Sequence, residues 1–340
     1  MNDVRIINSI APTRICDVGG WTDTWFSRRG CIFSIAVYPY VEVQVKVYPR
    51  TNEENQLIVN LENFGESFAL NPQNIHYEYY PLIEAAIDSV DIPGDKFCEV
   101  NVFSNMPPGA STGTSGSLTV ALIGALDALT EGHLSVSETA RLAHEVETVK
   151  LKQQSGIQDQ FCAAFGGVNF IEMREYPYAT VSPLSIADNI LLELERRLIL
   201  VYIGTPHDSS AIHKKVIEKL GNDAENSPYM IELRRLASKV KSCLYDGDFI
   251  NFGDCLNKNT QVQREMHPYL VCDKLENIID ICRSYGALGC KVNGAGGDGG
   301  TITVLTDGDT NKKRKLMKEL TDKGFSIIPV YLAKQGLRVW

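Results

Sequence analysis

Asn105-Met106-Pro107-Pro108-Gly109-Ala110-Ser111-Thr112-Gly113-Thr114-Ser115-Gly116-Ser117 is the stretch around which this chain is organised. A strand-like segment over 98–103 leads into it, and an apolar run of helical length, 118–126, follows directly. The first N–H groups of a helix have no intrahelical partners and carry partial positive charge, so they attract phosphate. Glycines let the backbone approach an anion, and hydroxyls add donors or metal ligands. A simple helix cap needs fewer such residues, so the stretch predicts a phosphate-binding loop.

Length and charge bound the architecture and the partners. At 340 residues the chain is long for one core and suits two lobes, and 44% hydrophobic with 22% charged residues is typical of a soluble globular protein. The net charge of −9 argues against nucleic acid as a partner, because phosphate backbones are held by clustered Lys and Arg. A nucleotide would instead be met by backbone dipoles, a few cations and a metal ion.

The cysteines and the apolar runs indicate the compartment. None of the nine cysteines forms a Cys-x-x-Cys pair and the six histidines show no ligand spacing, so reduced, mostly buried thiols are expected rather than a zinc site. The first residues show no signal-peptide pattern, and no apolar run reaches the ~20 residues that span a bilayer. We therefore expect a cytoplasmic protein with no membrane partner. The oligomeric state stays open, with a homodimer among the alternatives.

A second glycine turn lies near the start of the chain, where Ala11-Pro12-Thr13-Arg14 leads to Gly19-Gly20-Trp21-Thr22-Asp23. A strand is expected over 4–10 before it and two adjoining strands over 31–47 after it. Arg14 is an unexpected charge in an apolar approach, although a surface arginine is the alternative. Asp23 could accept hydrogen bonds from two hydroxyl groups of a ligand and Trp21 could cover an apolar face of it, whereas a turn-capping Asp and a packing Trp are the structural alternatives.

Two acidic residues in the middle of the chain are candidates for chemistry. A capping box at Ser135 starts a helix on which Ala140, Ala143 and Glu147 share one face, and a carboxylate there must be paired or bound to a metal unless its head reaches solvent. Asp159 falls in the first turn of a short helix expected over 158–165, ended by Gly166 or Gly167. It could also be an ordinary helix-start acid.

A third glycine-rich loop, Lys291-Val292-Asn293-Gly294-Ala295-Gly296-Gly297-Asp298-Gly299-Gly300, precedes a strand over 301–305. So many glycines cost chain entropy, and close backbone approach to a ligand explains them better than a structural turn. His207, in a Ser-rich turn, could touch substrate or lie in solvent. The other expected elements are a hairpin over 57–70, strands over 198–203 and 327–330, and helices over 79–90, 211–220, 230–244, 249–264 and 312–323.

These three turns, in this order, resemble the motifs of the GHMP kinases, the family of galactokinase and of the homoserine, mevalonate and phosphomevalonate kinases. Their second motif is usually Pro-x-x-Gly-Leu-Gly-Ser-Ser-Ala; here Ser111 and Thr112 replace Gly-Leu, Thr114 the first Ser and Gly116 the Ala. Asp298 replaces a glycine of the third motif. Gly-Gly-Trp-Thr-Asp and Gln-Asp-Gln are similar to the sugar-1-kinase branch that contains heptose 7-phosphate kinase and fucokinase. Galactokinases have Glu-His before Thr-Asp, which argues against galactokinase itself.

The resemblance implies an α+β fold, the two-lobed GHMP kinase fold. Its N-terminal ATP-binding lobe, ribosomal protein S5 domain 2-like, would span 1–185, and its ferredoxin-like C-terminal lobe 186–340. The nucleotide would lie between the lobes. ATP and Mg²⁺ are the implied cofactors, and a small-molecule sugar or sugar phosphate is the implied partner.

The resemblance also implies roles for individual residues. Asp159 would orient the acceptor hydroxyl and take its proton, with Arg14 beside it to keep it ionised and stabilise the transferring phosphoryl group. Ser115 and Glu147 would hold Mg²⁺. The ATP phosphates would be bound by Pro108, Gly109, Ala110, Ser111, Thr112, Gly113, Thr114 and Ser115, and the sugar by Asp23, Thr22, Trp21, Gly20 and Gly296.

The implied function is an ATP-dependent sugar kinase, with the anomeric C1 hydroxyl as the expected acceptor. A heptose 7-phosphate, fucose, a galactose-like sugar and a uronic acid all stay open. A phosphorylated substrate would require an extra cationic pocket, for which Arg28, Arg29 and Lys291 are candidates. The alternatives are a mevalonate- or homoserine-type kinase, against which Thr22 and Asp23 argue, and a non-catalytic relative that binds sugar and ATP.

Overall fold

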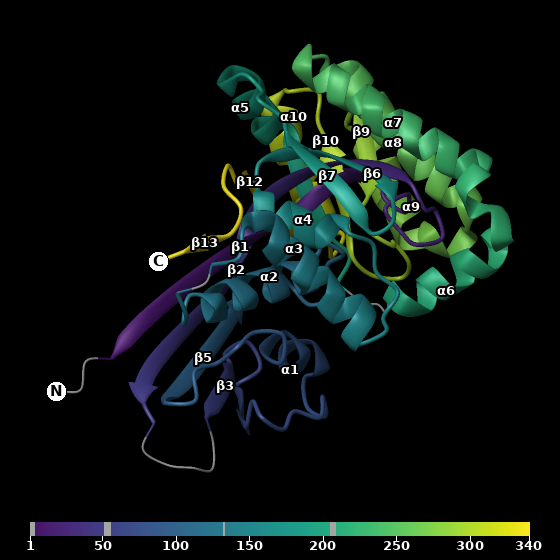
Figure 1. Cartoon of the computed structure of the whole chain (residues 1–340). Coiled ribbons are helices and arrows are strands. Elements are labelled where there is room, and N and C mark those ends of the chain that lie inside the picture. Colours follow the sequence, from purple (N-terminus) through teal and green to yellow (C-terminus); the bar gives the residue numbers. More distant parts are fainter. Residues whose placement is uncertain (1–3, 51–55, 132, 205–208) are drawn as a thin grey trace.

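The computed structural model describes residues 4–50, 56–131, 133–204 and 209–340, and these form two β-sheets with flanking helices (Figure 1). His207, which the sequence offered as a substrate contact, lies outside the described residues. Among the helices that are described, none is long and apolar enough to cross a bilayer.

The larger sheet is built mostly from the first half of the chain. Its strands follow the order β13-β1-β2-β5-β3-β4, while β6 and β12 also pair with β2, and β7 pairs with β6. The bounds are β1 (Arg5–Val18), β2 (Gly30–Pro49), β3 (Leu57–Leu61), β4 (Glu66–Leu70), β5 (Lys96–Ser104), β6 (Val168–Glu175), β7 (Tyr178–Pro183), β12 (Tyr331–Leu332) and β13 (Arg338–Val339).

The prediction of two strands over 31–47 is wrong, because β2 is one strand of 20 residues. Its first half, 30–35, pairs with β6, and its second half, 41–49, pairs with β5. Two different neighbours along one edge explain why the sequence pattern changes midway. β1 is also longer than predicted, since it continues to Val18 and carries Arg14 within the strand.

Helices of the first half cover one face of this sheet and share a core with it. Val120, Ile123 and Phe161 are buried there, as the apolar runs predicted. The short helix α4 has the predicted bounds, 158–165, and the glycine after it has a φ of +65°. The helices are α1 (Pro81–Ile87), α2 (Thr114–Asp127), α3 (Val136–Glu145) continued by a π-helical turn (Val146–Lys150), and α4 (Gln158–Phe165).

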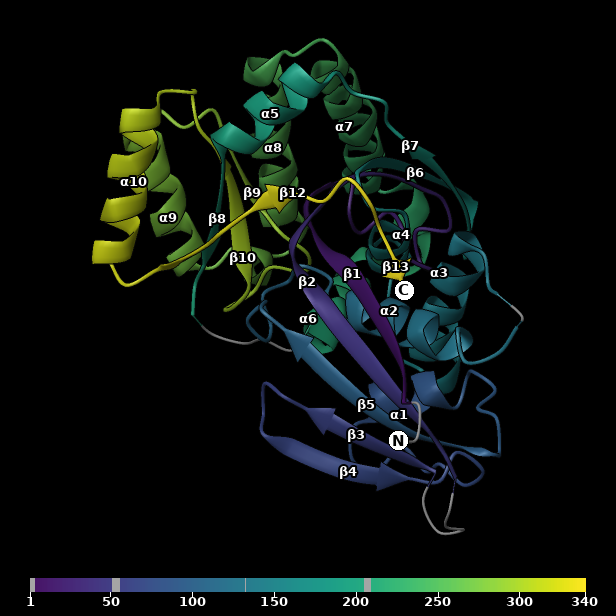
Figure 2. The ribbon, with the colours of Figure 1, turned by 90° about the vertical axis from the view of Figure 1, so that its left-hand side faces the viewer.

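The smaller sheet has the order β11-β8-β10-β9, all antiparallel. Helix α8 packs on β9 and α7 packs on β2, so these two helices join the sheets into one core. Figure 2 shows α9 and α10 on the side of the smaller sheet that faces away from β1 and β2. The bounds are α5 (Asp188–Arg197), β8 (Leu198–Tyr202), α6 (Ser209–Leu220), a 3₁₀ turn (Gly221–Asn226), α7 (Pro228–Tyr245), α8 (Phe249–Met266), a second 3₁₀ turn (Pro268–Leu270), α9 (Asp273–Ser284), β9 (Gly289–Val292), β10 (Thr301–Leu305), α10 (Thr310–Asp322) and β11 (Ser326–Ile328).

The end of the chain returns to the larger sheet. Tyr331 pairs with Tyr38 of β2, and Val339 pairs with Ser9 of β1. The proposed lobes, 1–185 and 186–340, stay a prediction, but these last strands connect the second segment to the sheet of the first.

Candidate active site

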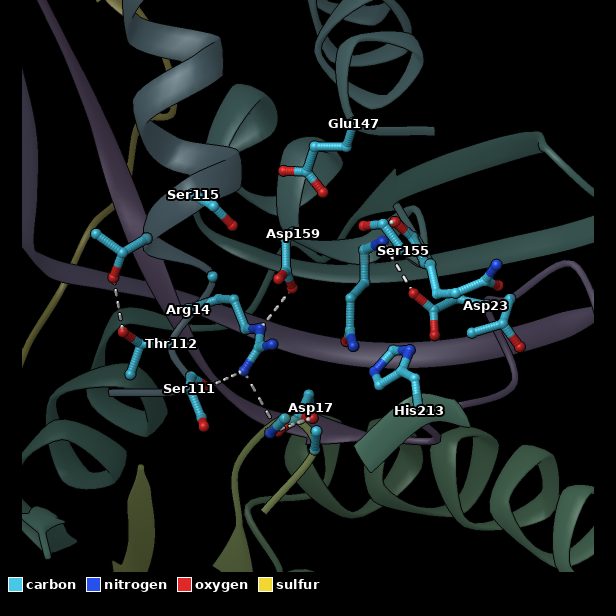
Figure 3. Close-up of a pocket in the computed structure, with 18 of the residues that line it drawn as sticks. Arg14, Asp17, Asp23, Ser111, Thr112, Ser115, Glu147, Ser155, Asp159 and His213 are labelled. Atoms are coloured by element: carbon cyan, nitrogen blue, oxygen red, sulfur yellow. Dashed lines mark hydrogen bonds and ion pairs between the residues drawn. The ribbon is translucent and has the colours of Figure 1, made fainter. Parts of the chain in front are cut away.

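A cavity of about 270 Å³ lies where the three glycine-bearing turns meet (Figure 3). Hydrogen bonds join the turns directly, because Arg14 N donates to Thr112 O at 2.9 Å and Thr301 Oγ1 donates to Ala110 O at 2.7 Å. All three turns contribute to the lining, which consists of Arg14, Asp17, Trp21, Asp23, Thr24, 109–115, Glu147, 153–156, Gln158, Asp159, His213, Gly294 and Ala295.

The second turn brings the start of α2 to the cavity. Gly109, Ser111 and Gly113 have φ angles of 68°, 58° and 71°, in the left-handed region. Gly113 is the N-cap residue and makes no side-chain cap, so the first N–H groups of α2 are not used by a capping side chain. This arrangement of backbone donors and helix dipole favours a phosphate group.

Two departures from the family motifs have different structural consequences. Ser111, where the family has glycine, adopts the left-handed φ that an L-residue pays about 1 kcal/mol to occupy. Asp298 is exposed and does not have a positive φ, whereas Gly296, Gly297 and Gly300 do. Asp298 therefore replaces a glycine at a position where the backbone does not require one.

Asp159 packs directly against two glycines of the second motif. A Cβ built on Gly113 would lie 2.9 Å from Asp159 Cγ, and one built on Gly116 would lie 2.9 Å from Asp159 Cβ. Real Cβ atoms do not come so close, so these glycines let α4 approach the start of α2. The carboxylate of Asp159 is thereby held beside the proposed phosphate site.

Arg14 and Asp159 form an ion pair inside the cavity (Figure 3). Arg14 Nε lies 2.8 Å from Asp159 Oδ1, and Arg14 Nη1 donates to Ser111 O at 2.5 Å. Arg14 is only 4% exposed, which excludes the alternative of a surface arginine. Burial by itself lowers the pKa of Arg14, but the Asp159 and Asp17 carboxylates raise it by more than burial lowers it. The pKa is therefore above its ordinary value, and the guanidinium stays charged.

Asp17 reaches this site because β1 is irregular. In a regular strand, residues 14 and 17 point to opposite faces. The pairing of β1 with β2 shifts between Ile15 and Val18, and Cys16 has a φ of 53°. The bulge turns Asp17 to the side of Arg14, whose Nη1 lies 3.8 Å from Asp17 Oδ1.

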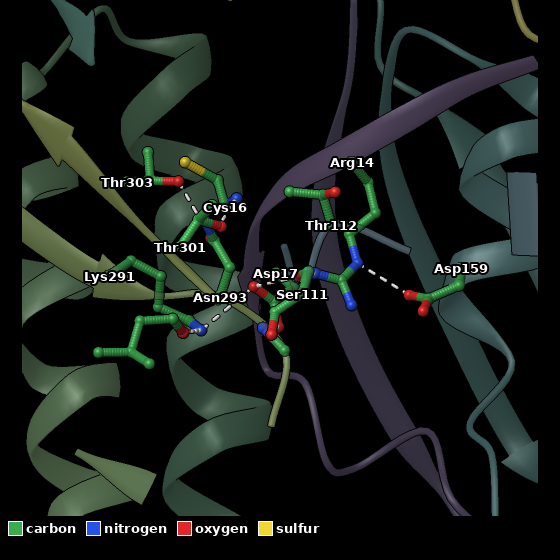
Figure 4. Close-up of polar contacts among 12 residues, drawn as sticks. Arg14, Cys16, Asp17, Ser111, Thr112, Asp159, Lys291, Asn293, Thr301 and Thr303 are labelled. Carbon is green, nitrogen blue, oxygen red and sulfur yellow. Dashed lines mark hydrogen bonds and ion pairs between the residues drawn. The ribbon is translucent and has the colours of Figure 1, made fainter. Parts of the chain in front are cut away.

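Asp17 also connects the first turn to the third (Figure 4). Its Oδ2 accepts from Gly294 N at 3.0 Å, and its Oδ1 lies 3.2 Å from Lys291 Nζ. Lys291 is 1% exposed and also donates to Val292 O. Burial lowers the pKa of Lys291, and Asp17 opposes this. Lys291 is therefore an internal partner of Asp17.

Glu147 is buried next to the start of α2. It shares the inward face of its helix with Ala140 and Ala143, so the alternative of a head reaching solvent is wrong. Glu147 Oε1 has no hydrogen-bond partner in the described part of the chain. Burial raises the pKa of Glu147 to about 7, partly offset by the Ser155 hydroxyl. A buried carboxylate oxygen without a donor is costly unless a cation is supplied, which suits a metal ligand. Ser115 is exposed in the first turn of α2.

Asp23 and His213 lie on the other side of Asp159 from Thr112 and Ser115 (Figure 3). Asp23 Oδ2 accepts from the backbone N of Gln158 at 3.1 Å. Burial raises the pKa of Asp23 to about 6, the Gln158 N–H bond lowers it, and the Asp159 charge raises it.

An aromatic pair borders this half of the cavity. The rings of Trp21 and His213 have centroids 4.6 Å apart, and both residues line the cavity. The Trp21 Nε1 is buried and has no hydrogen-bond partner among the described residues. Trp21 belongs to the buried hydrophobic core and also lines the cavity, so its packing role and its predicted sugar contact both stay predictions.

Four predicted site residues do not line the cavity, namely Pro108, Gly20, Thr22 and Gly296. Thr22 Oγ1 donates to Gly19 O at 2.7 Å, so it closes the turn that carries Asp23. A Cβ on Gly296 would lie 2.0 Å from Leu270 O, so this glycine permits packing of the third turn.

Other lining residues were not predicted. Gln158 belongs to the Gln-Asp-Gln motif and Gln154 and Ser155 shortly precede it, and that proximity could have indicated them. His213 comes from α6 and Thr24 follows the first motif. No sequence pattern marks His213, because only the packing of the two halves brings it to the cavity.

Two family models match the chain and define its class. The N-terminal domain model of the GHMP kinases matches residues 79–167, and the C-terminal model matches residues 240–320. The chain belongs to the GHMP kinase family. The predicted family and the predicted two-lobed α+β fold are therefore confirmed.

Individual relatives narrow this similarity to the sugar-kinase branch. D-glycero-α-D-manno-heptose 7-phosphate kinase of Campylobacter jejuni is 30% identical over 241 residues, covering 71% of this chain and 70% of that protein. Bifunctional fucokinase/GDP-fucose pyrophosphorylase of Arabidopsis thaliana is 24% identical over 94% of this chain, which spans only 32% of that longer protein. The crystal structure of a putative sugar kinase from Campylobacter jejuni shares the fold, with a TM-score of 0.79, 23% identity and coverage of 100% and 99% of the two chains.

Proposed function

We propose that this protein is an ATP-dependent sugar kinase that transfers the γ-phosphate of ATP to a sugar hydroxyl, with the anomeric C1 hydroxyl as the acceptor. The observation that carries the proposal is the Arg14–Asp159 pair, 2.8 Å apart, between the start of α2 and the side of the cavity that holds Asp23. The named sugar kinases among its relatives support the same activity.

The proposed reaction has a simple balance of atoms. The sugar oxygen forms a bond to the γ-phosphorus, the bond from that phosphorus to the β-bridging oxygen breaks, and ADP leaves. Asp159 accepts the proton of the hydroxyl, while Arg14 stabilises charge on the transferring group. The backbone of 109–115 and the dipole of α2 would bind the phosphates without a cluster of cations, in keeping with the net charge of −9.

Ser115 and Glu147 would hold a Mg²⁺ ion. The buried, unpartnered Oε1 of Glu147 and the hydroxyl of Ser115 are oxygen ligands of the kind that this ion prefers. When bound, Mg²⁺ neutralises phosphate charge during transfer. On the opposite side, the Asp23 carboxylate and the Trp21 ring would hold the sugar.

An ADP-release screen over free and phosphorylated sugars, with phosphorus NMR of the product, tests this proposal. ADP release that depends on one sugar, with a phosphate on its C1 oxygen, is the expected result. If mevalonate or homoserine but no sugar supported turnover, the small-molecule alternative would replace it. Binding of sugar and ATP without transfer would indicate a non-catalytic relative.

Glu147→Gln is expected to raise the Mg²⁺ concentration that turnover requires and to stabilise the fold at alkaline pH. Burial raises the pKa of Glu147 to about 7, so the folded state retains a proton that the unfolded state releases near its ordinary pKa. Stability contributed by the proton is present at low pH and is lost as pH rises toward 7. Without Mg²⁺, the variant should therefore be up to about 3 kcal/mol more stable at pH 8 and nearly unchanged at pH 4.5.

Urea unfolding at the two pH values measures the stability, and a Mg²⁺ titration of turnover measures the metal effect. The variant should need more Mg²⁺ for half-maximal turnover. Identical metal titrations of the variant and the wild type would remove Glu147 from the metal site, and equal stability at pH 8 would contradict its buried charge.

Gly116→Ala is expected to lower kcat about tenfold although alanine is the better helix former. The new Cβ would lie 2.9 Å from Asp159 Cβ and would displace this carboxylate by a few tenths of an ångström or more. Gly124→Ala, in the same helix, is the matched control, because the atoms nearest to its Cβ belong to the flexible side chain of Leu337 and not to Asp159. Steady-state kinetics of both variants would contradict the argument if they were equally active.

A further inference from the structure

We propose that the acceptor is a neutral, unphosphorylated sugar, bound through its hydroxyls by Asp23, by the Trp21 indole N–H and by the Gln158 side-chain carbonyl. This inference rests on the proposed kinase function and specifies its substrate class. The proposed substrate carries no phosphate, and in this it differs from the heptose 7-phosphate named for the similar kinase of Campylobacter jejuni.

Charge in the cavity disfavours an anionic sugar. Four carboxylates, those of Asp17, Asp23, Glu147 and Asp159, line it. Arg14 is the one Lys or Arg that lines it among the described residues, and the residues outside the described ranges contain neither type. Lys291 and Arg14 offset the charge of Asp17, and Arg14 also pairs with Asp159. Asp23, on the side proposed for the sugar, has no ion pair among the described residues, so a sugar phosphate or a uronate would meet this carboxylate without a compensating cation.

Arg14 is not available as the counter-ion of a second anion. Its Nε bonds Asp159, and its Nη1 bonds Ser111 O and lies near Asp17. The guanidinium is almost completely buried. The charge of Arg14 is thus paired with carboxylates of the protein and, in the proposed reaction, stabilises the transferring phosphoryl group.

The cations that the sequence offered for a phosphorylated substrate are placed elsewhere. Lys291 is buried and paired with Asp17. Arg29 pairs with Glu225 at 2.9 Å, and Arg28 is exposed and does not line the cavity. The cationic pocket that a phosphorylated sugar would require is not formed by these residues.

The unused polar atoms suit hydroxyl groups instead. Trp21 Nε1 and Gln158 Oε1 are buried and unpartnered in the described structure, and both residues line the cavity. One is a donor and the other an acceptor, and a sugar hydroxyl can satisfy either. Buried polar groups are costly without partners, so a polyol that supplies both is favoured. The Trp21 ring adds an apolar surface for sugar C–H groups.

Matched pairs of sugars test the substrate class. Galactose is compared with galactose 6-phosphate and with galacturonate, and mannose is compared with mannose 6-phosphate, using the full chain with ATP and Mg²⁺. Fucose is added as a further neutral sugar. The expected result is a kcat/KM for a neutral sugar at least about 100-fold above that of its charged counterpart. Turnover of a phosphorylated sugar or a uronate at a rate equal to or above that of its parent would overturn the inference while leaving the kinase proposal intact.

If the protein transfers no phosphate to any sugar, the inference is tested by the Kd of the same sugars, measured by calorimetry. Tighter binding of a neutral sugar than of its phosphate supports the inference even if the kinase proposal fails. Equal or tighter binding of the phosphate, or no binding of any neutral sugar, overturns it.

Two conservative variants test the residues, using the neutral sugar with the highest kcat/KM. Gln158→Leu and Trp21→Phe should each raise the sugar KM about tenfold and leave the KM for ATP unchanged. Each variant is then compared with the wild type in a series of deoxy sugars. For each variant, removal of the one hydroxyl that the lost side chain would contact should make the KM of variant and wild type equal, which a purely structural role would not do. Effects that are equal for every deoxy sugar would remove these contacts from the proposal.

Discussion

Asp159→Asn is expected to lower kcat by about 10³-fold, because a positioned base that accepts the proton of the attacking hydroxyl contributes of this order. Asparagine has nearly the same shape, and its Oδ1 can still accept from Arg14 Nε, which now lies 2.8 Å from Asp159 Oδ1. The fold and the nucleotide site should therefore survive. Steady-state kinetics and the Kd of ATP, measured by calorimetry, separate the two effects.

The alternative interpretation of Asp159 is an ordinary acid at the start of a helix. Asp273→Asn is the matched control, because Asp273 is an exposed acid in the first turn of α9, away from the cavity. Both variants lose a favourable interaction with a helix dipole, worth roughly 0.3–1 kcal/mol in stability. Asp159→Asn also loses the charge that faces the buried Arg14, while keeping an acceptor for its Nε. Only Asp159→Asn should lose turnover. Unchanged kcat for this variant would remove Asp159 from its proposed role.

Local patterns in the sequence were sufficient to predict the three glycine-bearing turns and two of the buried charged residues beside them, Arg14 and Glu147. Glycines at 109, 113 and 294 have positive φ, which side chains rarely adopt, so their pattern reports the backbone directly. Arg14 and Glu147 could be predicted because a charge in an apolar pattern needs a partner inside the protein. Both are indeed buried.

Features that depend on irregular or long-range geometry could not be predicted. Alternation along β1 places Asp17 opposite Arg14, and only the bulge at Cys16 reverses this. His213 reaches Trp21 from α6, far along the chain. The pairing of β2 with β6 and then β5 along its length and the return of Tyr331 to it are likewise set by tertiary packing.

Asp17→Ala is expected to destabilise the fold by about 3–5 kcal/mol, since it removes one partner of a buried ion pair. Lys291 Nζ, 3.2 Å from Asp17 Oδ1, would lose its only carboxylate partner among the described residues. Burial already lowers the pKa of Lys291, so its charge would become still less favourable. Gly294 N would also lose its acceptor. Urea unfolding at pH 8 measures the loss.

The double variant Asp17→Ala, Lys291→Met tests whether Asp17→Ala is destabilising because it leaves the charge of Lys291 unpaired or because it removes the other contacts of Asp17. Methionine fills much of the lysine volume without burying a charge, so the double variant should be more stable than Asp17→Ala alone. It should still turn over slowly, because Arg14 would keep Asp159 but lose the Asp17 carboxylate 3.8 Å from its Nη1. Strict additivity of the two single effects would show that Asp17 and Lys291 do not interact. Recovery of both stability and kcat would show that Asp17 balances Lys291 alone and has no influence on Arg14.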